Sequence, residues 1–128
     1  MKKFDFLAVE VNLKNIKKNV LFYSPGIIKN KTTNTLFLTI SNSKKNLDNY
    51  ICCLDRDEVL GIPFEYLDGT LHFIDETTSQ AYKSVSLEEI FKNPNQAYKE
   101  EINVSKTVRY IINKKKYKVR IIILIYKQ

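Results

Sequence analysis

Three carboxylates lie within four residues in the middle of the chain, at Asp55, Asp57 and Glu58. Hard cations such as Mg²⁺ and Ca²⁺ bind several oxygen ligands that converge on one point, so this run could contribute to a metal site. The spacing of an EF-hand is absent, and no acid of the chain is followed two residues later by a lysine, a combination that suits a metal nuclease. We therefore interpret these acids as an acidic surface turn and keep a small metal-dependent enzyme as an alternative function.

The chain contains two cysteines, Cys52 and Cys53, and a single histidine, His72. Neighbouring cysteines rarely satisfy disulfide geometry with each other, and the apolar run around them predicts two small buried residues on opposite faces of a strand. A lone histidine in a strand indicates a solvent-facing residue, and no zinc spacing can be written with these three side chains. The sequence thus predicts no catalytic residue, no metal and no cofactor, and it indicates a reducing, intracellular location.

Basic and aromatic residues are interleaved near the end of the chain, in a segment that we expect to form a β-hairpin. Cations bind phosphate groups and aromatic rings stack on bases, so this combination is typical of single-strand RNA or DNA binding. Tyrosine is also common in ordinary strands, and lysine at a hairpin tip discourages pairing with another chain. Along the last strand we expect Lys116, Lys118 and Arg120 to share a face. The candidate residues for binding nucleic acid or a partner are Arg109, Tyr110, Lys114, Lys115, Lys116, Tyr117, Lys118 and Arg120.

Charge divides the sequence into three blocks. Residues 1–45 carry a net charge of +7, residues 46–101 carry −8, and residues 102–128 carry +8. This division predicts two electrostatically distinct surfaces and therefore a partner. Only three of the 21 basic residues are arginine, whose planar group binds phosphate best, and Lys, Ile and Asn are abundant. The lysine excess is thus equally consistent with a phosphate-binding surface and with the codon usage of an AT-rich gene.

Short alternating runs separated by turn signals predict a chain rich in β-strands. The run from Tyr50 to Leu54 is apolar throughout, which predicts a strand buried on both faces. An Asp-Gly pair between two alternating runs predicts a hairpin with a two-residue type I′ turn. The strands expected from these signals are Leu7–Leu13, Val20–Tyr23, Leu36–Ile40, Tyr50–Leu54, Ile62–Leu67 and Thr70–Ile74.

Residues 86–102 predict one short helix and allow a second. Ser86 followed by Glu89 matches a capping box, so a helix of about two turns should begin there and end at Asn93 before Pro94. The sequence also allows a second short helix from Asn95 to Ile102, with Asn95 as its N-cap.

The last two strands are expected at Val104–Ile112 and Tyr117–Tyr126, joined by a turn at Asn113–Lys116. The run Ile121–Ile125 is apolar on both faces, and such a strand at a sheet edge would promote aggregation. It is therefore predicted to be a central strand or to be covered by the short helices.

These elements predict a single domain over residues 1–128 of the α+β, β-rich class: a mainly antiparallel curled sheet or small barrel, with one or two short helices near residues 86–102. The longest apolar run is too short to span a bilayer, so we expect a cytoplasmic or virion-associated protein with no membrane contact. The leading hypothesis is a non-enzymatic interaction protein, encoded by a phage or mobile element as an accessory, inhibitor or virion factor. It would bind a protein partner or self-associate, and single-strand nucleic-acid binding is the main alternative.

Overall fold

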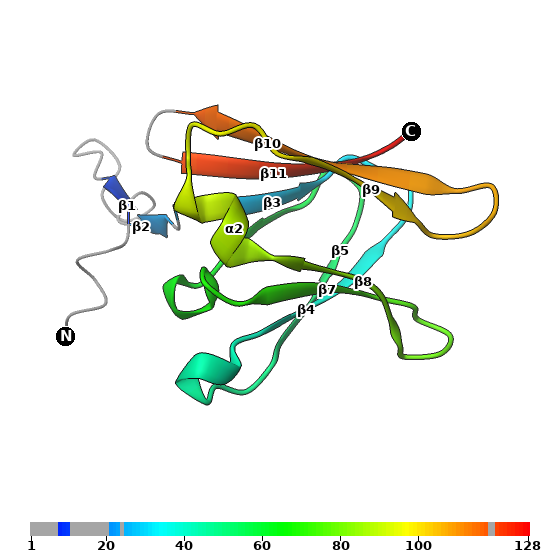
Figure 1. Ribbon diagram of the computed structural model, residues 1–128, viewed down its shortest axis with the longest axis horizontal. Helices are drawn as coiled ribbons and strands as arrows, with labels where there is room; N and C mark the ends of the chain where they lie inside the picture. The colour runs from blue at the N-terminus through cyan, green and yellow to red at the C-terminus, as the bar shows by residue number, and fades with distance from the viewer. Residues whose placement is uncertain (1–7, 11–20, 24, 118–119) are drawn as a thin grey trace.

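Two β-sheets packed face to face form most of the structure (Figure 1). The computed structural model describes residues 8–10, 21–23, 25–117 and 120–128. Among these residues, strands β1 (Ala8–Glu10) and β2 (Leu21–Tyr23) pair only with each other. The five-stranded sheet has the order β6 (Val59–Gly61), β3 (Gly26–Asn30), β11 (Arg120–Lys127), β10 (Arg109–Tyr117) and β9 (Lys99–Asn103). The four-stranded sheet has the order β5 (Tyr50–Leu54), β4 (Leu36–Ser41), β7 (Thr70–Ile74) and β8 (Ala81–Ser86).

The β-rich class is confirmed, whereas the small barrel is wrong, because the strands form two separate sheets that keep their edges. Neighbouring strands are antiparallel with one exception among the described residues: β11 pairs with β3 in parallel, with Ile123 opposite Ile28. After β3 the chain forms β4 and β5 of the four-stranded sheet, returns for β6, and crosses again to form β7 and β8. It then adds β9 and β10 to the five-stranded sheet and places β11 beside β3. This long crossover is why the parallel pair could not be inferred from neighbouring runs of sequence.

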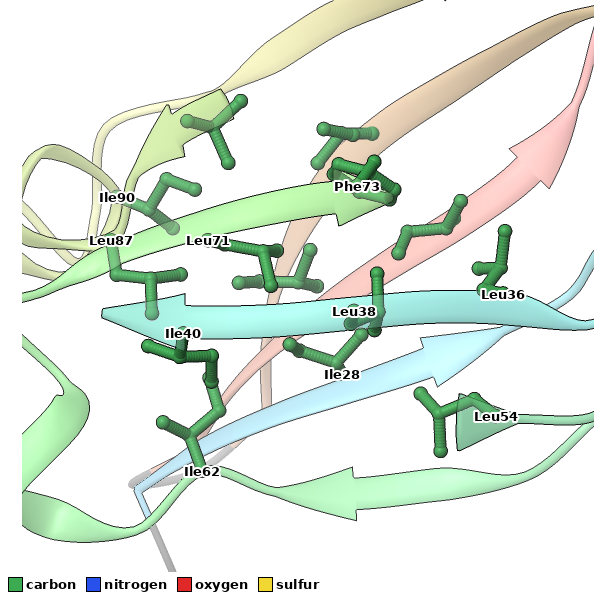
Figure 2. Close-up of a cluster of buried hydrophobic side chains, with 14 of the residues drawn as sticks. Ile28, Leu36, Leu38, Ile40, Leu54, Ile62, Leu71, Phe73, Leu87 and Ile90 are labelled. Atoms are coloured by element: carbon green, nitrogen blue, oxygen red, sulfur yellow. The ribbon is translucent and has the colours of Figure 1, made fainter. Parts of the chain in front are cut away.

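The core lies between the two sheets and uses every second residue of their inner strands (Figure 2). Ile121, Ile123 and Ile125 of β11 are buried, and β11 lies between β3 and β10, which confirms the central position predicted for this apolar run. The opposing sheet contributes fully buried side chains from β4 and β7. Complete burial of an aliphatic or Phe side chain stabilises a fold by about 1.5–3 kcal/mol, so this layer is the main source of stability. Its members from the four-stranded sheet include Leu36, Leu38, Ile40, Leu71 and Phe73.

Helix α2 (Leu87–Lys92) closes one end of the sandwich (Figure 1). The hydroxyl of Ser86 accepts a hydrogen bond from the N–H of Glu89 at 3.3 Å, as the capping box predicts, and the helix ends at Asn93. Leu87 and Ile90 are fully buried against the core.

The second helix expected at Asn95–Ile102 is wrong: residues Lys99–Asn103 form β9 instead. In that strand Ile102 is fully buried and pairs with Tyr110 of β10. Tertiary pairing thus outweighs the weak helix signal of this segment.

The hairpin predicted around Asp68–Gly69 is half wrong. Strand β7 is present, but Phe64–Tyr66 forms a short 3₁₀ helix rather than the other arm, and no glycine has the positive φ of a type I′ turn in the described chain. A Cβ atom on Gly69 would lie 2.2 Å from the carbonyl oxygen of Ser41. This glycine is needed for a close approach of two backbones. A second 3₁₀ helix spans Ser43–Lys45.

The C-terminal hairpin is confirmed, but its turn is displaced. Strand β10 runs to Tyr117, which pairs with Arg120, so the turn predicted at Asn113–Lys116 is wrong. Those four residues pair with residues 121–124 of β11.

Asn30 ties the two sheets together where the chain crosses between them. Its side-chain amide donates to the carbonyl oxygens of Leu54 and Asn34, at 2.9 and 2.8 Å. Its side-chain oxygen accepts from the N–H and the hydroxyl of Thr32, at 2.9 and 2.7 Å. Asn30 is completely buried, so these bonds replace every interaction with water that its side chain gives up.

Candidate functional site

The outer face of the five-stranded sheet is basic. Strand register places Lys29 of β3, Lys99 of β9 and Lys115 of β10 on the side opposite to the buried isoleucines. Arg109 and Arg120 lie on the same side. Among the described strand residues, Glu101 is the one acid on that side. Aromatic and aliphatic side chains lie between the charges. We call this surface the basic face; its other described members include Ile27, Ile111, Asn113, Ile122, Leu124 and Tyr126.

The structure divides the predicted binding residues between the two sides of the hairpin. Arg109, Lys115 and Arg120 lie on the basic face, whereas Lys114 and Lys116 pair with Ile123 and Ile121 and lie on the inner side, next to α2. The expectation that Lys116 and Arg120 share a face is therefore wrong. Tyr110 is buried in the core with 3% exposure, and its hydroxyl accepts from the amide of Asn34. Tyr117 pairs with Arg120, and Lys118 lies outside the described residues.

The two inner lysines bind the end of helix α2 and the segment that follows it. The Lys114 ammonium group donates to the carbonyl oxygens of Ile90 and Asn93, at 2.9 and 2.8 Å, and that of Lys116 donates to the side-chain oxygen of Asn95 at 2.9 Å. Burial lowers the pKa of Lys114. Both side chains are thus engaged within the fold and contribute no charge to the basic face.

The outer face of the four-stranded sheet carries no Asp, Glu, Lys or Arg at its strand positions in the described chain. Its acidic neighbours lie beyond the strand ends instead: Asp55 and Asp75 follow β5 and β7 at one end, and Asp68 precedes β7 at the other. We call this surface the uncharged face. It consists of Phe37, Thr39, Ser41, Ile51, Cys53, Thr70, His72, Ile74, Ala81, Ser84 and Ser86.

One half of the uncharged face is polar and centres on His72, which lies on the outer side of β7 as its strand pattern predicts. Its Nε2 atom is 2.9 Å from the hydroxyl of Ser41, and its Nδ1 atom is 2.7 Å from the hydroxyl of Ser84. Ser84 of β8 lies directly opposite His72, and Ser41 of β4 lies diagonally across from it, two residues along from Thr39. We interpret these contacts as cross-strand hydrogen bonding that fixes the register of the sheet.

The other half of the uncharged face is apolar. Ile51 is 77% exposed, Cys53 is exposed, and Phe37 and Ile74 are half-buried beside them. A hollow of about 390 Å³ lies over these four side chains, with Asp75, Glu76 and Ser79 at its margin. Sequence reasoning missed this surface. The signal available was the absence of charge from residues 49–54, which indicates an unusual edge as readily as a buried strand.

The predicted burial of Tyr50–Leu54 on both faces is wrong, because β5 lies at the edge of its sheet. Cys52 is half-buried and Cys53 is exposed, and neither forms a disulfide. Burial raises the pKa of Cys52 to about 11, and the pKa of Cys53 is also raised, by burial and by nearby acids. A raised thiol pKa favours the neutral form, which suits contact with apolar groups.

The acids Asp55, Asp57 and Glu58 do not converge on one point. Asp55 accepts from the hydroxyl of Thr35 at 2.7 Å, Glu58 accepts from the N–H of Asp55 at 2.7 Å, and Asp57 lies 3.8 Å from the guanidinium of Arg56. Each carboxylate has its own local contact, and the described residues contain no group of three His, Cys, Asp or Glu side chains that could hold a metal ion.

No model of a known protein family matches the chain, and no curated protein is similar to it at a significant level. None of the helices in the described parts of the chain is long and apolar enough to cross a membrane.

Proposed function

We propose that the chain is a non-enzymatic interaction protein that binds another protein through the apolar half of its uncharged face. The observation that carries this proposal is Ile51, which is 77% exposed on an edge strand and lines one hollow together with Phe37, Cys53 and Ile74. An aliphatic side chain gains about 25 cal/mol for each Å² of surface that a partner removes from water.

The chemistry of this surface suits a protein partner. The centre of a protein interface is poor in charged residues, and its rim is polar. The uncharged face has this distribution, since the outward-facing positions of its strands carry no charge and Asp75 and Glu76 line the hollow. A nucleic acid would meet no cation on this face. The abundance of Lys, Ile and Asn agrees with an accessory protein of a phage or mobile element.

A second candidate function, single-strand nucleic-acid binding, is favoured by the opposite surface. The basic face holds Lys29, Lys99, Arg109, Lys115 and Arg120 over one sheet, with the ring of Tyr126 among them. Flat sheets that present cations and an aromatic ring are suited to phosphates and stacked bases. The two functions use different faces and can be separated by substitution.

A photo-activated cross-linking residue tests the first function in cells that express the chain. It is placed at position 51 and, as a matched control, at position 59, where Val59 is 54% exposed on another edge strand. We expect covalent adducts to a protein from position 51 and few from position 59. Equal adduct yields from both positions, or none from position 51, would refute protein binding through this face.

A further inference from the structure

The two sheets have four edges, and three of them are protected against pairing with another strand. Strand β6 has only three residues, and β8 carries Lys83 and a bulge in its pairing with β7. Strand β9 contains Lys99, Glu100 and Glu101. The side chains of Lys83 and Glu100 form an ion pair, so β8 and β9 also protect each other. Short edges, charges and bulges are the usual means by which proteins prevent edge-to-edge association.

Strand β5 has none of these protections. Its five residues, Tyr-Ile-Cys-Cys-Leu, contain no charge and no proline, and their register with β4 is regular. It is an edge strand: in the described chain it pairs only with β4, and no strand pairs with its other side. An apolar, uncharged strand with one open edge is a template for an added strand.

We propose that this added strand is β5 of a second copy of the chain, antiparallel about a twofold axis at Cys52; this proposal names the partner of the proposed function and rests on it. A strand from any other edge of the second copy would bring a charge, a bulge or too few residues. Pairing of β5 with itself avoids all three. Each copy then uses its one unprotected edge, so the assembly closes as a dimer with a continuous eight-stranded sheet, the sum of two four-stranded sheets.

The length of β5 selects the register of this pair. With Cys52 on the axis, all five residues of the strand are paired, and Ile51 lies opposite Cys53 of the second copy. An axis at Cys53 or at Ile51 would leave two residues of each strand without a partner in β5 of the second copy. The pairing ends near Leu54, because residues 55–58 form a turn in which the N–H of Glu58 donates to the carbonyl oxygen of Asp55.

The first experiment measures self-association by sedimentation from about 1 to about 200 µM, since a weak dimer forms by mass action. We expect the wild-type chain to dimerise, I51K to remain monomeric, and V59K to dimerise like the wild type. Both side chains are largely exposed, so neither substitution should lower the melting temperature. A wild-type monomer over the whole range, or a dimer that I51K leaves intact, would overturn the proposal.

The second experiment tests the register. Mild oxidation with copper phenanthroline should cross-link the dimer of C53S through a disulfide between the two Cys52 side chains, which lie opposite each other on the axis, and should leave the dimer of C52S without a cross-link. A cross-link in C52S and none in C53S would overturn the register at Cys52. Adducts to a foreign protein from position 51, together with a wild-type monomer, would overturn self-pairing while the proposed function stands. Absence of both adducts and dimer would overturn both.

Discussion

The ammonium nitrogen of Lys114 lies 2.9 Å from the carbonyl oxygen of Ile90, so a lysine of β10 closes the last turn of helix α2. Carbonyl groups at the end of a helix have no intrahelical partner and carry a partial negative charge, and an ammonium group satisfies both. A residue that the sequence suggests for phosphate binding therefore serves the fold. Its neighbour Lys115, on the other side of the strand, keeps its charge at the surface.

The substitution K114M should lower the free energy of unfolding by about 1–2 kcal/mol, because two charge-assisted hydrogen bonds are lost. The matched variant K115M should change it by less than about 0.5 kcal/mol, as expected for an exposed side chain away from such contacts. Urea denaturation of the three proteins measures the difference. Equal effects of the two substitutions would show that the contact with Ile90 does not stabilise α2.

Substitution of the buried Asn30 should lower the free energy of unfolding by more than K114M does. N30A removes the donor to the carbonyl oxygens of Leu54 and Asn34 and the acceptor for the N–H of Thr32, whereas the Thr32 hydroxyl keeps its bond to the carbonyl oxygen of Asn34. We expect the free energy of unfolding to fall by about 3 kcal/mol or more, since each buried group left unsatisfied costs about 1–3 kcal/mol. The exposed neighbour Thr33 provides the control T33A, which should be nearly neutral. Thermal or urea unfolding of both variants would contradict this role if N30A were as stable as T33A.

The local signals of the sequence were sufficient for the elements that depend on neighbouring residues. The cap at Ser86, the end of α2 at Asn93 and the alternation that buries Ile121, Ile123 and Ile125 all follow from short-range chemistry. The wrong predictions concern long-range partners. Residues 95–102 carry a weak helix signal, and pairing with β10 decides their conformation.

The candidate site illustrates the same limit. The sequence analysis places Lys114 and Lys115 in a turn; in the structure they lie on opposite sides of β10, and the position of α2 decides which side is covered. Likewise, an apolar run such as Tyr50–Leu54 has the same appearance at the centre and at the edge of a sheet. The difference between buried and exposed depends on the strand order, which a single sequence does not contain.

The ion pair between Lys83 and Glu100 predicts a dependence of stability on acid. Burial opposes ionisation of Glu100, but hydrogen bonds from Lys83 and Tyr98 outweigh it and hold the carboxyl pKa below its usual value of 4.5. A lowered pKa in the folded state adds stability above the unfolded value, and this stability is lost as the pH falls through the folded value. The wild type should therefore lose more stability than E100Q between pH 7 and about pH 3, by up to about 1 kcal/mol for a partly exposed pair.

The control for this acid dependence is E101Q, because Glu101 lies on the opposite side of β9. Its loss of stability on acidification should match that of the wild type. Urea unfolding at the two pH values measures all three proteins. If E100Q were as sensitive to acid as the wild type, the pair between β8 and β9 would not be a source of pH dependence.

Nucleic-acid binding predicts that charge reversal on the basic face matters and that the same reversal elsewhere does not. If single-stranded RNA or DNA binds this face, R109E/K115E should weaken binding at least about tenfold and reduce its dependence on salt, because fewer counterions are released. The control K92E/K106E makes the same change in net charge at exposed positions of α2 and of the turn before β10. Fluorescence anisotropy with labelled single strands at two salt concentrations measures both. Equal weakening by the two double variants would indicate attraction by net charge alone, and no binding by the wild type at low salt would assign the lysine excess to codon usage.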